Sequence, residues 1–126
     1  PRAMATAIYY MLTPETFSHL HRLDADEMYH FYLGDAVELC ELKPDGTSSV
    51  TQLGQDLARG QCVQHLVKAG SWQGSRLKAG GAWALLGTTM SPGYQQEGYE
   101  HGDRALLTSQ YPTQTVLIEA LTNTPG

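Results

Sequence analysis

An imidazole and a carboxylate on either side of a short reversal are the residues of this sequence best suited to chemistry. His21 lies near the end of one β-prone run and Glu27 begins the next, and the short stretch 23–26, with two aspartates, lies between the runs. Side by side, such a pair can transfer protons, with the carboxylate orienting the imidazole, or can bind a divalent metal ion. The simplest alternative is a surface hairpin whose polar residues have no chemical role.

Alternation along the two runs adds further candidates. In residues 16–22 the period of two predicts that His19 and His21 point to the same side, so His19 is an additional candidate metal ligand. In residues 27–33 the same rule puts Tyr29 on the face of Glu27, where its hydroxyl could act as a general acid. His30 falls on the opposite face unless a bulge intervenes.

The elements that must position these residues are short strands separated by turn signals. We expect strands at 7–12, 16–22, 27–33, 37–42, 50–53, 62–67, 72–77 and 82–88. A Pro-Asp-Gly turn at 43–46 indicates a hairpin. Strands at this spacing are typical of a sandwich or barrel and not of a βαβ fold.

Only the last quarter of the chain changes character. Asp103 is placed to cap a short helix that runs to about Gln110, and Pro112 is placed in the first turn of another. The polar stretch 98–102 before them, which contains Glu100 and His101, is expected to be a solvated connection. The sequence therefore predicts an all-β domain with short C-terminal helices.

Composition limits the partners of this domain. A chain of 126 residues fits a single domain, residues 1–126, and its net charge of −5 argues against nucleic-acid binding. The apolar runs are shorter than the ~20 residues that a membrane-spanning helix needs, so no membrane partner is expected. Cys40 and Cys62 lie in apolar, strand-like segments. They are predicted to be thiols and not a disulfide, which favours a cytoplasmic location.

Two short motifs resemble those of the cupin superfamily. His19, His21, Glu27 and Gly34 resemble the first cupin motif, although five residues separate His21 from Glu27 where the family usually has three or four. Residues 68–73 resemble the second motif, with Gln73 in place of the histidine that binds metal. A glutamine carbonyl is a poorer transition-metal ligand than imidazole, so the resemblance to a metal-binding cupin is incomplete.

A more specific resemblance covers nearly the whole chain. It is to the uncharacterised subfamily catalogued as the fifth cupin family, and it involves residues 2–10, 17–18, 21–22, 26–35, 69–73, 91–94, 103–105 and 111–112. This resemblance implies a cupin-type jelly-roll β-barrel, a homodimer, and structural similarity to deoxysugar epimerases. Members also carry a segment rich in Pro-Glu-Gly-Gly before the match to Arg2. This sequence does not contain that segment, so part of the first sheet and of the pocket rim is expected to be missing.

The favoured interpretation is an isomerase or epimerase that acts on a small polar, sugar-like ligand by acid-base chemistry. His21 is the expected base, Glu27 orients it, and Tyr29 is the expected acid. Arg22, Gln73 and His30 are the expected ligand-binding residues.

Two alternatives remain open. In the first, His21, Glu27, Gln73 and His19 hold a divalent metal ion (Zn, Ni, Fe or Mn), the one cofactor that this sequence suggests, and support oxygenase or hydrolase chemistry. In the second, the domain is a non-catalytic ligand-binding barrel.

Overall fold

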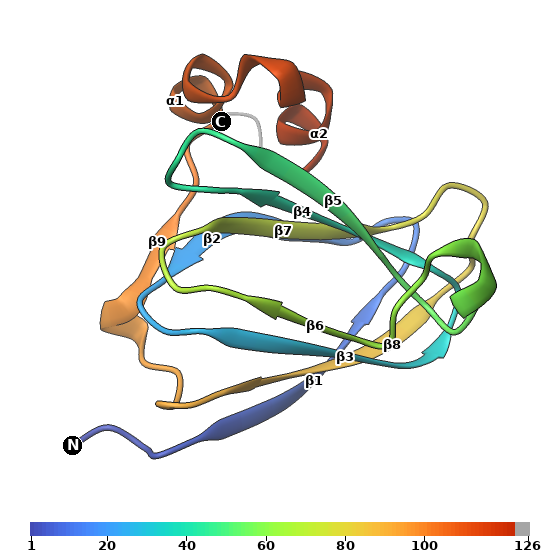
Figure 1. Cartoon of the computed structure of the whole chain (residues 1–126), viewed down its shortest axis with the longest axis horizontal. Coiled ribbons are helices and arrows are strands. Elements are labelled where there is room, and N and C mark those ends of the chain that lie inside the picture. The colour runs from blue at the N-terminus through green and yellow to red at the C-terminus, as the bar shows by residue number, and fades with distance from the viewer. Residues whose placement is uncertain (123–126) are drawn as a thin grey trace.

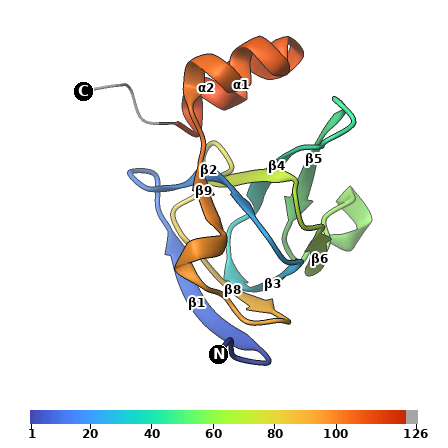
Figure 2. The ribbon, with the colours of Figure 1, turned by 90° about the vertical axis from the view of Figure 1, so that its left-hand side faces the viewer.

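The computed structural model describes residues 1–122 as two antiparallel β-sheets that face each other (Figures 1 and 2). The strands are β1 (Thr6–Leu12), β2 (Phe17–Leu23), β3 (Glu27–Gly34), β4 (Val37–Leu42), β5 (Ser48–Leu53), β6 (Gln64–Val67), β7 (Trp72–Leu77), β8 (Ala84–Met90) and β9 (Tyr99–His101). The helices are η1 (Leu57–Arg59), η2 (Gln96–Gly98), α1 (Arg104–Gln110), η3 (Pro112–Gln114) and α2 (Thr115–Ala120). No helix within residues 1–122 is long and apolar enough to cross a membrane.

The order of the strands confirms the predicted jelly-roll class. One sheet has the order β1-β8-β3-β6 and the other β5-β4-β7-β2-β9, and most neighbours in each sheet are distant in sequence. Over the described part of the chain the two sheets stay separate and do not close into one continuous barrel. The site residues therefore lie between two stacked sheets.

The space between the sheets holds the main core. Alternate residues of facing strands fill it, including Tyr29 and Phe31 of β3, Leu39 of β4 and Leu86 of β8. This is the pattern expected when one face of each strand is buried. The prediction that Glu27 and Tyr29 share the inner face is confirmed by the burial pattern of β3.

A second core covers the outer face of the five-stranded sheet. Helices α1 and α2 lie over this face (Figure 1), and their Leu107 and Ile118 pack with Leu20 and Trp72 of the sheet. Asp103 caps α1 by accepting a hydrogen bond from the Leu106 backbone N–H at 2.9 Å, as predicted. Burial of each large apolar side chain contributes about 1.5–3 kcal/mol, which holds these short helices on the sheet.

Turn chemistry accounts for the β4–β5 hairpin. Gly46 has a φ of 91°, a left-handed conformation that glycine adopts without strain. The Asp45 carboxylate accepts hydrogen bonds from the backbone N–H of Thr47 at 2.9 Å and from its hydroxyl at 2.6 Å. The predicted hairpin is confirmed.

A bulge in β2 breaks the alternation predicted for residues 16–22. Ser18 pairs with Ser75 and His21 with Gln73, so two residues of β2 lie opposite the single residue Gly74. A Cβ at Gly74 would lie 3.0 Å from the Leu20 side chain and from the Ser18 carbonyl oxygen, which explains the glycine there. The bulge interrupts the alternation between His19 and His21. The ring of His19 stacks on that of His101, the residue of β9 that pairs with His21.

Two further outcomes concern the loop at 98–102 and the cysteines. Residues 99–101 form strand β9, which pairs with β2, where the sequence predicts a solvated connection. Three residues are too few to show a strand periodicity, and pairing with β2 decides their conformation.

Cys40 is buried and Cys62 is half-buried, and both are free thiols, as predicted.

Candidate functional site

His21 and Glu27 line the same cavity between the sheets. Its volume is about 460 Å³, and its other polar lining residues are Thr6 and Thr88. The apolar and aromatic part of the wall consists of Ala7, Ile8, Leu23, Met90, Tyr94 and Tyr99. An adjoining cavity of about 300 Å³ shares Ile8, His21, Glu27 and Thr88 with it and extends to Tyr10 and Tyr29.

The ring of His21 is held so that one nitrogen remains free. Its Nδ1 lies 2.7 Å from the carbonyl oxygen of His19. A carbonyl only accepts hydrogen bonds, so Nδ1 carries the proton and Nε2 keeps its lone pair. Burial lowers the pKa of His21 below its usual 6.5, and this effect exceeds the stabilising hydrogen bond to His19. His21 therefore has the tautomer and the charge of a general base.

Glu27 has the opposite electrostatic behaviour. Glu27 is only 8% exposed, and its Oε1 is buried without a hydrogen-bond partner among the described residues. Burial raises the pKa of its carboxyl above the usual 4.5, and the neighbouring side chains of Thr88 and Gln73 offset this only in part. Burial thus lowers the pKa of His21 and raises the pKa of Glu27 on the same cavity wall. Opposite pKa shifts of this kind are common for an acid and a base in catalysis.

Tyr29 and Gln73 join the two sheets beside Glu27. The Tyr29 hydroxyl donates a hydrogen bond to Oε1 of Gln73, and the two residues are only 2% and 1% exposed. Burial raises the pKa of Tyr29 well above 10, so its hydroxyl keeps its proton. Gln73 is not among the residues that line either cavity. The structure therefore places Gln73 behind the wall, where it supports Tyr29.

Tyr99 is a cavity residue that the sequence analysis missed. Strand β9 places its ring against His21, with centroids 5.3 Å apart and planes 16° from parallel. Its hydroxyl lies 3.0 Å from Nδ1 of His101, whose ring in turn stacks on His19 at 3.7 Å. The sequence interpretation treated residues 98–102 as a solvated loop and gave no signal for this stacking.

Tyr10 and Thr88 were also missed. The Tyr10 hydroxyl lies 3.4 Å from the Ser75 hydroxyl in the adjoining cavity, and burial raises the pKa of Tyr10. Thr88 of β8 lines both cavities. Alternation along the predicted strand at 82–88 could have suggested an inward-facing threonine.

The expected metal ligands do not converge. Nε2 of His19 lies 3.0 Å from the Gly102 carbonyl oxygen, and Gln73 is engaged by Tyr29. Only His21 and Glu27 of the four face the cavity, and residues 1–122 contain no group of three or more His, Cys, Asp or Glu that could hold a metal ion. A transition-metal site in a protein usually uses three or four such ligands, so this donor set does not fit one.

Arg22 and His30 lie outside the cavity. Arg22 donates hydrogen bonds to Glu100 at 2.6 and 3.2 Å, and its guanidinium lies 4.5 Å from the ring centre of Trp72, on the helix side of the sheet. Nε2 of His30 lies 2.9 Å from the Thr89 hydroxyl, and alternation along β3 puts His30 opposite Tyr29. Neither residue lines the pocket of His21, so the structure does not bring Arg22 and His30 to the candidate site.

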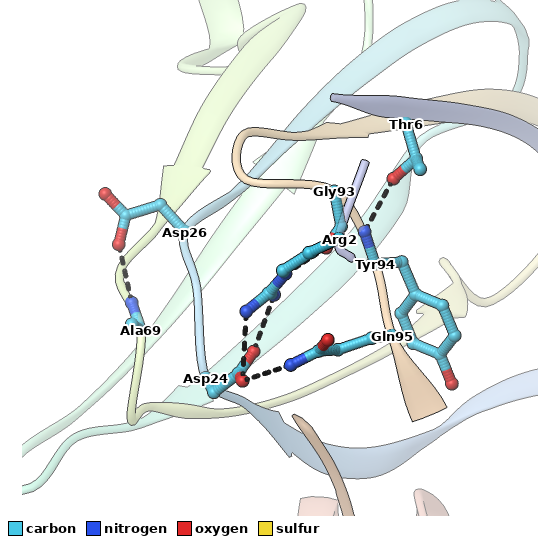
Figure 3. Close-up of polar contacts among 8 residues, drawn as sticks. All are labelled: Arg2, Thr6, Asp24, Asp26, Ala69, Gly93, Tyr94 and Gln95. Carbon is cyan, nitrogen blue, oxygen red and sulfur yellow. Dashed lines mark hydrogen bonds and ion pairs between the residues drawn. The ribbon is translucent and has the colours of Figure 1, made fainter. Parts of the chain in front are cut away.

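An ion pair next to the cavity ties the N-terminal residues to two loops (Figure 3). The guanidinium of Arg2 donates to both carboxylate oxygens of Asp24, at 2.8 and 3.2 Å, and its Nε donates to the Gly93 carbonyl at 2.6 Å. The Tyr94 backbone N–H donates to the Thr6 hydroxyl at 2.8 Å. Because Thr6 and Tyr94 both line the cavity, these contacts fix one part of its rim.

Comparison with known proteins gives a consistent result. A protein structure from Shewanella oneidensis is 33% identical in sequence and superposes with a TM-score of 0.91. The match covers 98% of this chain and 78% of the Shewanella chain. A hypothetical protein from Leishmania major is 28% identical with the same coverage and a TM-score of 0.90. A dTDP sugar isomerase from Desulfovibrio desulfuricans is 14% identical, covers 80% of this chain and 66% of its own, and has a TM-score of 0.66, a likeness in fold. No curated protein matches the chain significantly.

Family membership follows from the sequence match. The family model described as Cupin superfamily (DUF985) matches residues 1–102, which include both sheets and every residue that lines the two cavities. The chain belongs to this family of the cupin superfamily.

Proposed function

We propose that this protein binds a small polar molecule between its sheets and catalyses proton transfer on it, as an isomerase or epimerase does. The observation that supports this most directly is that His21 and Glu27 line one cavity. Among residues 1–122, neither Nε2 of His21 nor Oε1 of Glu27 has a hydrogen-bond partner. The fold similarity to a dTDP sugar isomerase agrees with this chemistry.

The proposed reaction is an enolisation. Nε2 of His21 removes a proton from the carbon next to a carbonyl, and the protonated Glu27 carboxyl donates its proton to the carbonyl oxygen, which gives a neutral enol. In the reverse transfers, His21 returns a proton to carbon, and the enol hydroxyl returns its proton to Glu27. If the proton returns to the neighbouring carbon of an enediol, the product is an isomer. If water donates a proton to the opposite face of the same carbon and His21 gives its own proton back to water, the product is an epimer.

The roles differ in two respects from those expected from the sequence. The carbonyl of His19 and the ring of Tyr99 orient His21, whereas Glu27 is free to serve as the acid. The Tyr29 hydroxyl is engaged with Gln73, so we assign Tyr29 a positioning role.

Solvent exchange tests this proposal. The native protein is incubated in D₂O with small hydroxycarbonyl compounds, both free sugars and their phosphates, and deuterium incorporation is followed by NMR. We expect exchange with at least one of them. We expect His21→Gln to slow it at least 100-fold, within the ~10²–10⁴-fold range of general acid-base catalysis.

His30→Gln is the matched control, because His30 lies on the other face of the sheet and should leave the rate unchanged. Exchange that survives in His21→Gln contradicts the proposed base. If one of the compounds binds but none of them incorporates deuterium, the result favours the non-catalytic ligand-binding barrel.

A homodimer is a second part of this proposal. Strand β1 lies at the edge of its sheet, and its outward Tyr9 and Met11 are 77% and 56% exposed. An exposed apolar edge strand is prone to pair with another chain, and a symmetric dimer would cover it. Sedimentation at micromolar concentration should show a dimer, and a monomer there contradicts this part.

We also infer a reducing compartment such as the cytoplasm. The support is that Cys40 and Cys62 are both free thiols. Fluorescence microscopy of the tagged protein in its source cell would show a cytoplasmic signal if this is correct.

A further inference from the structure

The charge of the cavity wall restricts the ligand. No Lys or Arg lines either the large cavity or the adjoining one, and all eight of these residues lie within the described residues 1–122. The only ionisable groups that the two cavities share are His21 and Glu27. A phosphate or carboxylate on a ligand would have no cation to pair with there.

Six of the eight basic residues are engaged outside the two cavities. Five pair with carboxylates outside the cavities: Arg2 with Asp24, Arg22 with Glu100, Arg59 with Asp56, Lys68 with Asp26, and Arg76 with Glu38. Arg104 donates to the carbonyl oxygens of Glu119 and Thr122 near the C-terminal helices. Recruiting any of the five paired residues to an anionic ligand would require breaking an existing ion pair.

An unpaired anion would be costly at the buried end of this site, beside Glu27 and Met90. Transfer of an ion from water into a largely apolar wall carries a large desolvation cost unless a counter-charge or several hydrogen-bond donors replace the water. Glu27 adds a carboxyl whose Oε1 has no hydrogen-bond partner in the described part of the chain, and a second negative group beside it would repel its ionised form. Sites that bind phosphate usually supply Arg or Lys.

The remaining groups match an uncharged molecule with one polar edge. Thr88, Glu27 and Nε2 of His21 offer neutral donors and acceptors, whereas Ile8 and Tyr99 offer apolar and aromatic contact. We propose that the cavity selects an uncharged hydroxyl- or carbonyl-bearing ligand and rejects its phosphorylated or carboxylated counterparts. This inference rests on the proposed function and specifies its substrate class.

Matched probes that differ only in charge test the selection. Protein-observed NMR follows the methyl groups of Thr88 and Met90 during titration with benzyl alcohol, benzoate and benzylamine, and with glucose, glucose 6-phosphate and glucosamine. We expect the neutral member of at least one series to shift these methyl signals and the anionic member to bind at least 10-fold more weakly.

The outcomes separate this inference from the proposed function. Equal or tighter binding of the anion or the amine in the cavity overturns the inference and leaves the proposed proton transfer intact. If none of the six probes shifts the cavity methyl groups, the cavity is not a ligand site for this class, and both proposals fail.

A designed charge provides an independent test. Ile8 lines both cavities, whereas the neighbouring Tyr9 points to the other face of the same strand. Ile8→Lys should increase affinity for benzoate or glucose 6-phosphate at least 10-fold, and Tyr9→Lys should not. An equal gain in affinity in both variants, or no gain in Ile8→Lys, would contradict the inference that anions are rejected because the cavity wall has no Lys or Arg.

Discussion

The hydroxyl of Tyr29 donates a hydrogen bond to the side-chain oxygen of Gln73 across the space between the two sheets. Tyr29 belongs to β3 and Gln73 to β7, and both are almost fully buried. The two sheets are not joined by a continuous ladder in the described part of the chain, so such side-chain contacts fix their relative position near the site. A similar contact between Nε2 of His65 and Glu41, at 2.8 Å, links β6 to β4.

Removal of the Tyr29 hydroxyl should therefore destabilise the protein. Tyr29→Phe leaves the buried Oε1 of Gln73 without its donor, and an unsatisfied buried acceptor costs about 1–3 kcal/mol. Urea unfolding should show this loss in the free energy of unfolding. Tyr32→Phe is the control, since Tyr32 is 41% exposed on the outer face and should change stability by less. An equal effect of the two substitutions contradicts the role given to the Tyr29–Gln73 contact.

The raised pKa of Glu27 predicts a specific pH dependence of stability. A carboxyl with a higher pKa in the folded state binds its proton more tightly there. Its contribution is therefore fully present below its ordinary pKa of 4.5 and is lost as the pH rises through the folded value. Glu27→Gln removes this titration, so the difference in Tm between native protein and variant should shift in favour of the variant as the pH increases from 4.5.

Thermal unfolding at several pH values measures this difference. Glu15→Gln, a substitution in an exposed turn, is the control and should show no such trend. A difference that is constant across the pH series would mean that Glu27 titrates alike in the folded and unfolded states, contrary to its burial.

The donor set of the site predicts that a metal ion does not stabilise the protein. Of the four expected ligands only His21 and Glu27 line the cavity, and two protein ligands bind a first-row metal weakly. Metal analysis of untagged protein should show far less than one equivalent. A chelator should leave Tm unchanged. Stoichiometric metal together with a lower Tm after chelation contradicts this expectation.

The sequence predicted eight of the nine described strands and the presence of His21 and Glu27 on one cavity, because both depend on local pattern. The reversal between His21 and Glu27 follows from turn residues, and the burial of Glu27 and Tyr29 follows from alternation along one strand. The contacts of His19 could not be predicted, because its ring stacks on His101 and its Nε2 lies beside the Gly102 carbonyl, both of which are far from it in sequence. Tyr99 was missed for a related reason. Its strand has three residues and exists through its pairing with β2, a contact over a long sequence distance.

The contact between Arg2 and Asp24 predicts an effect on the rim of the cavity and little effect on overall stability (Figure 3). The two side chains are 23% and 42% exposed, and such exposed pairs contribute little to stability. Arg2→Ala should therefore change the free energy of unfolding only slightly. It should, however, release the Gly93 carbonyl and loosen the neighbouring segment, in which the Tyr94 N–H bonds to Thr6. Hydrogen exchange measured by mass spectrometry should become faster at Tyr94.

Arg59→Ala is the matched control for this variant, because Arg59 also forms an exposed ion pair, with Asp56, in a loop that lines neither cavity. Exchange at Tyr94 should stay at the native rate in Arg59→Ala. Arg2→Lys should give an intermediate rate, since lysine keeps the charge but cannot donate to both oxygens of Asp24 and to the Gly93 carbonyl in the same fork geometry. If exchange at Tyr94 is the same in Arg2→Ala as in the native protein, the Arg2–Asp24 contact does not hold the rim, and the Thr6–Tyr94 hydrogen bond is sufficient by itself.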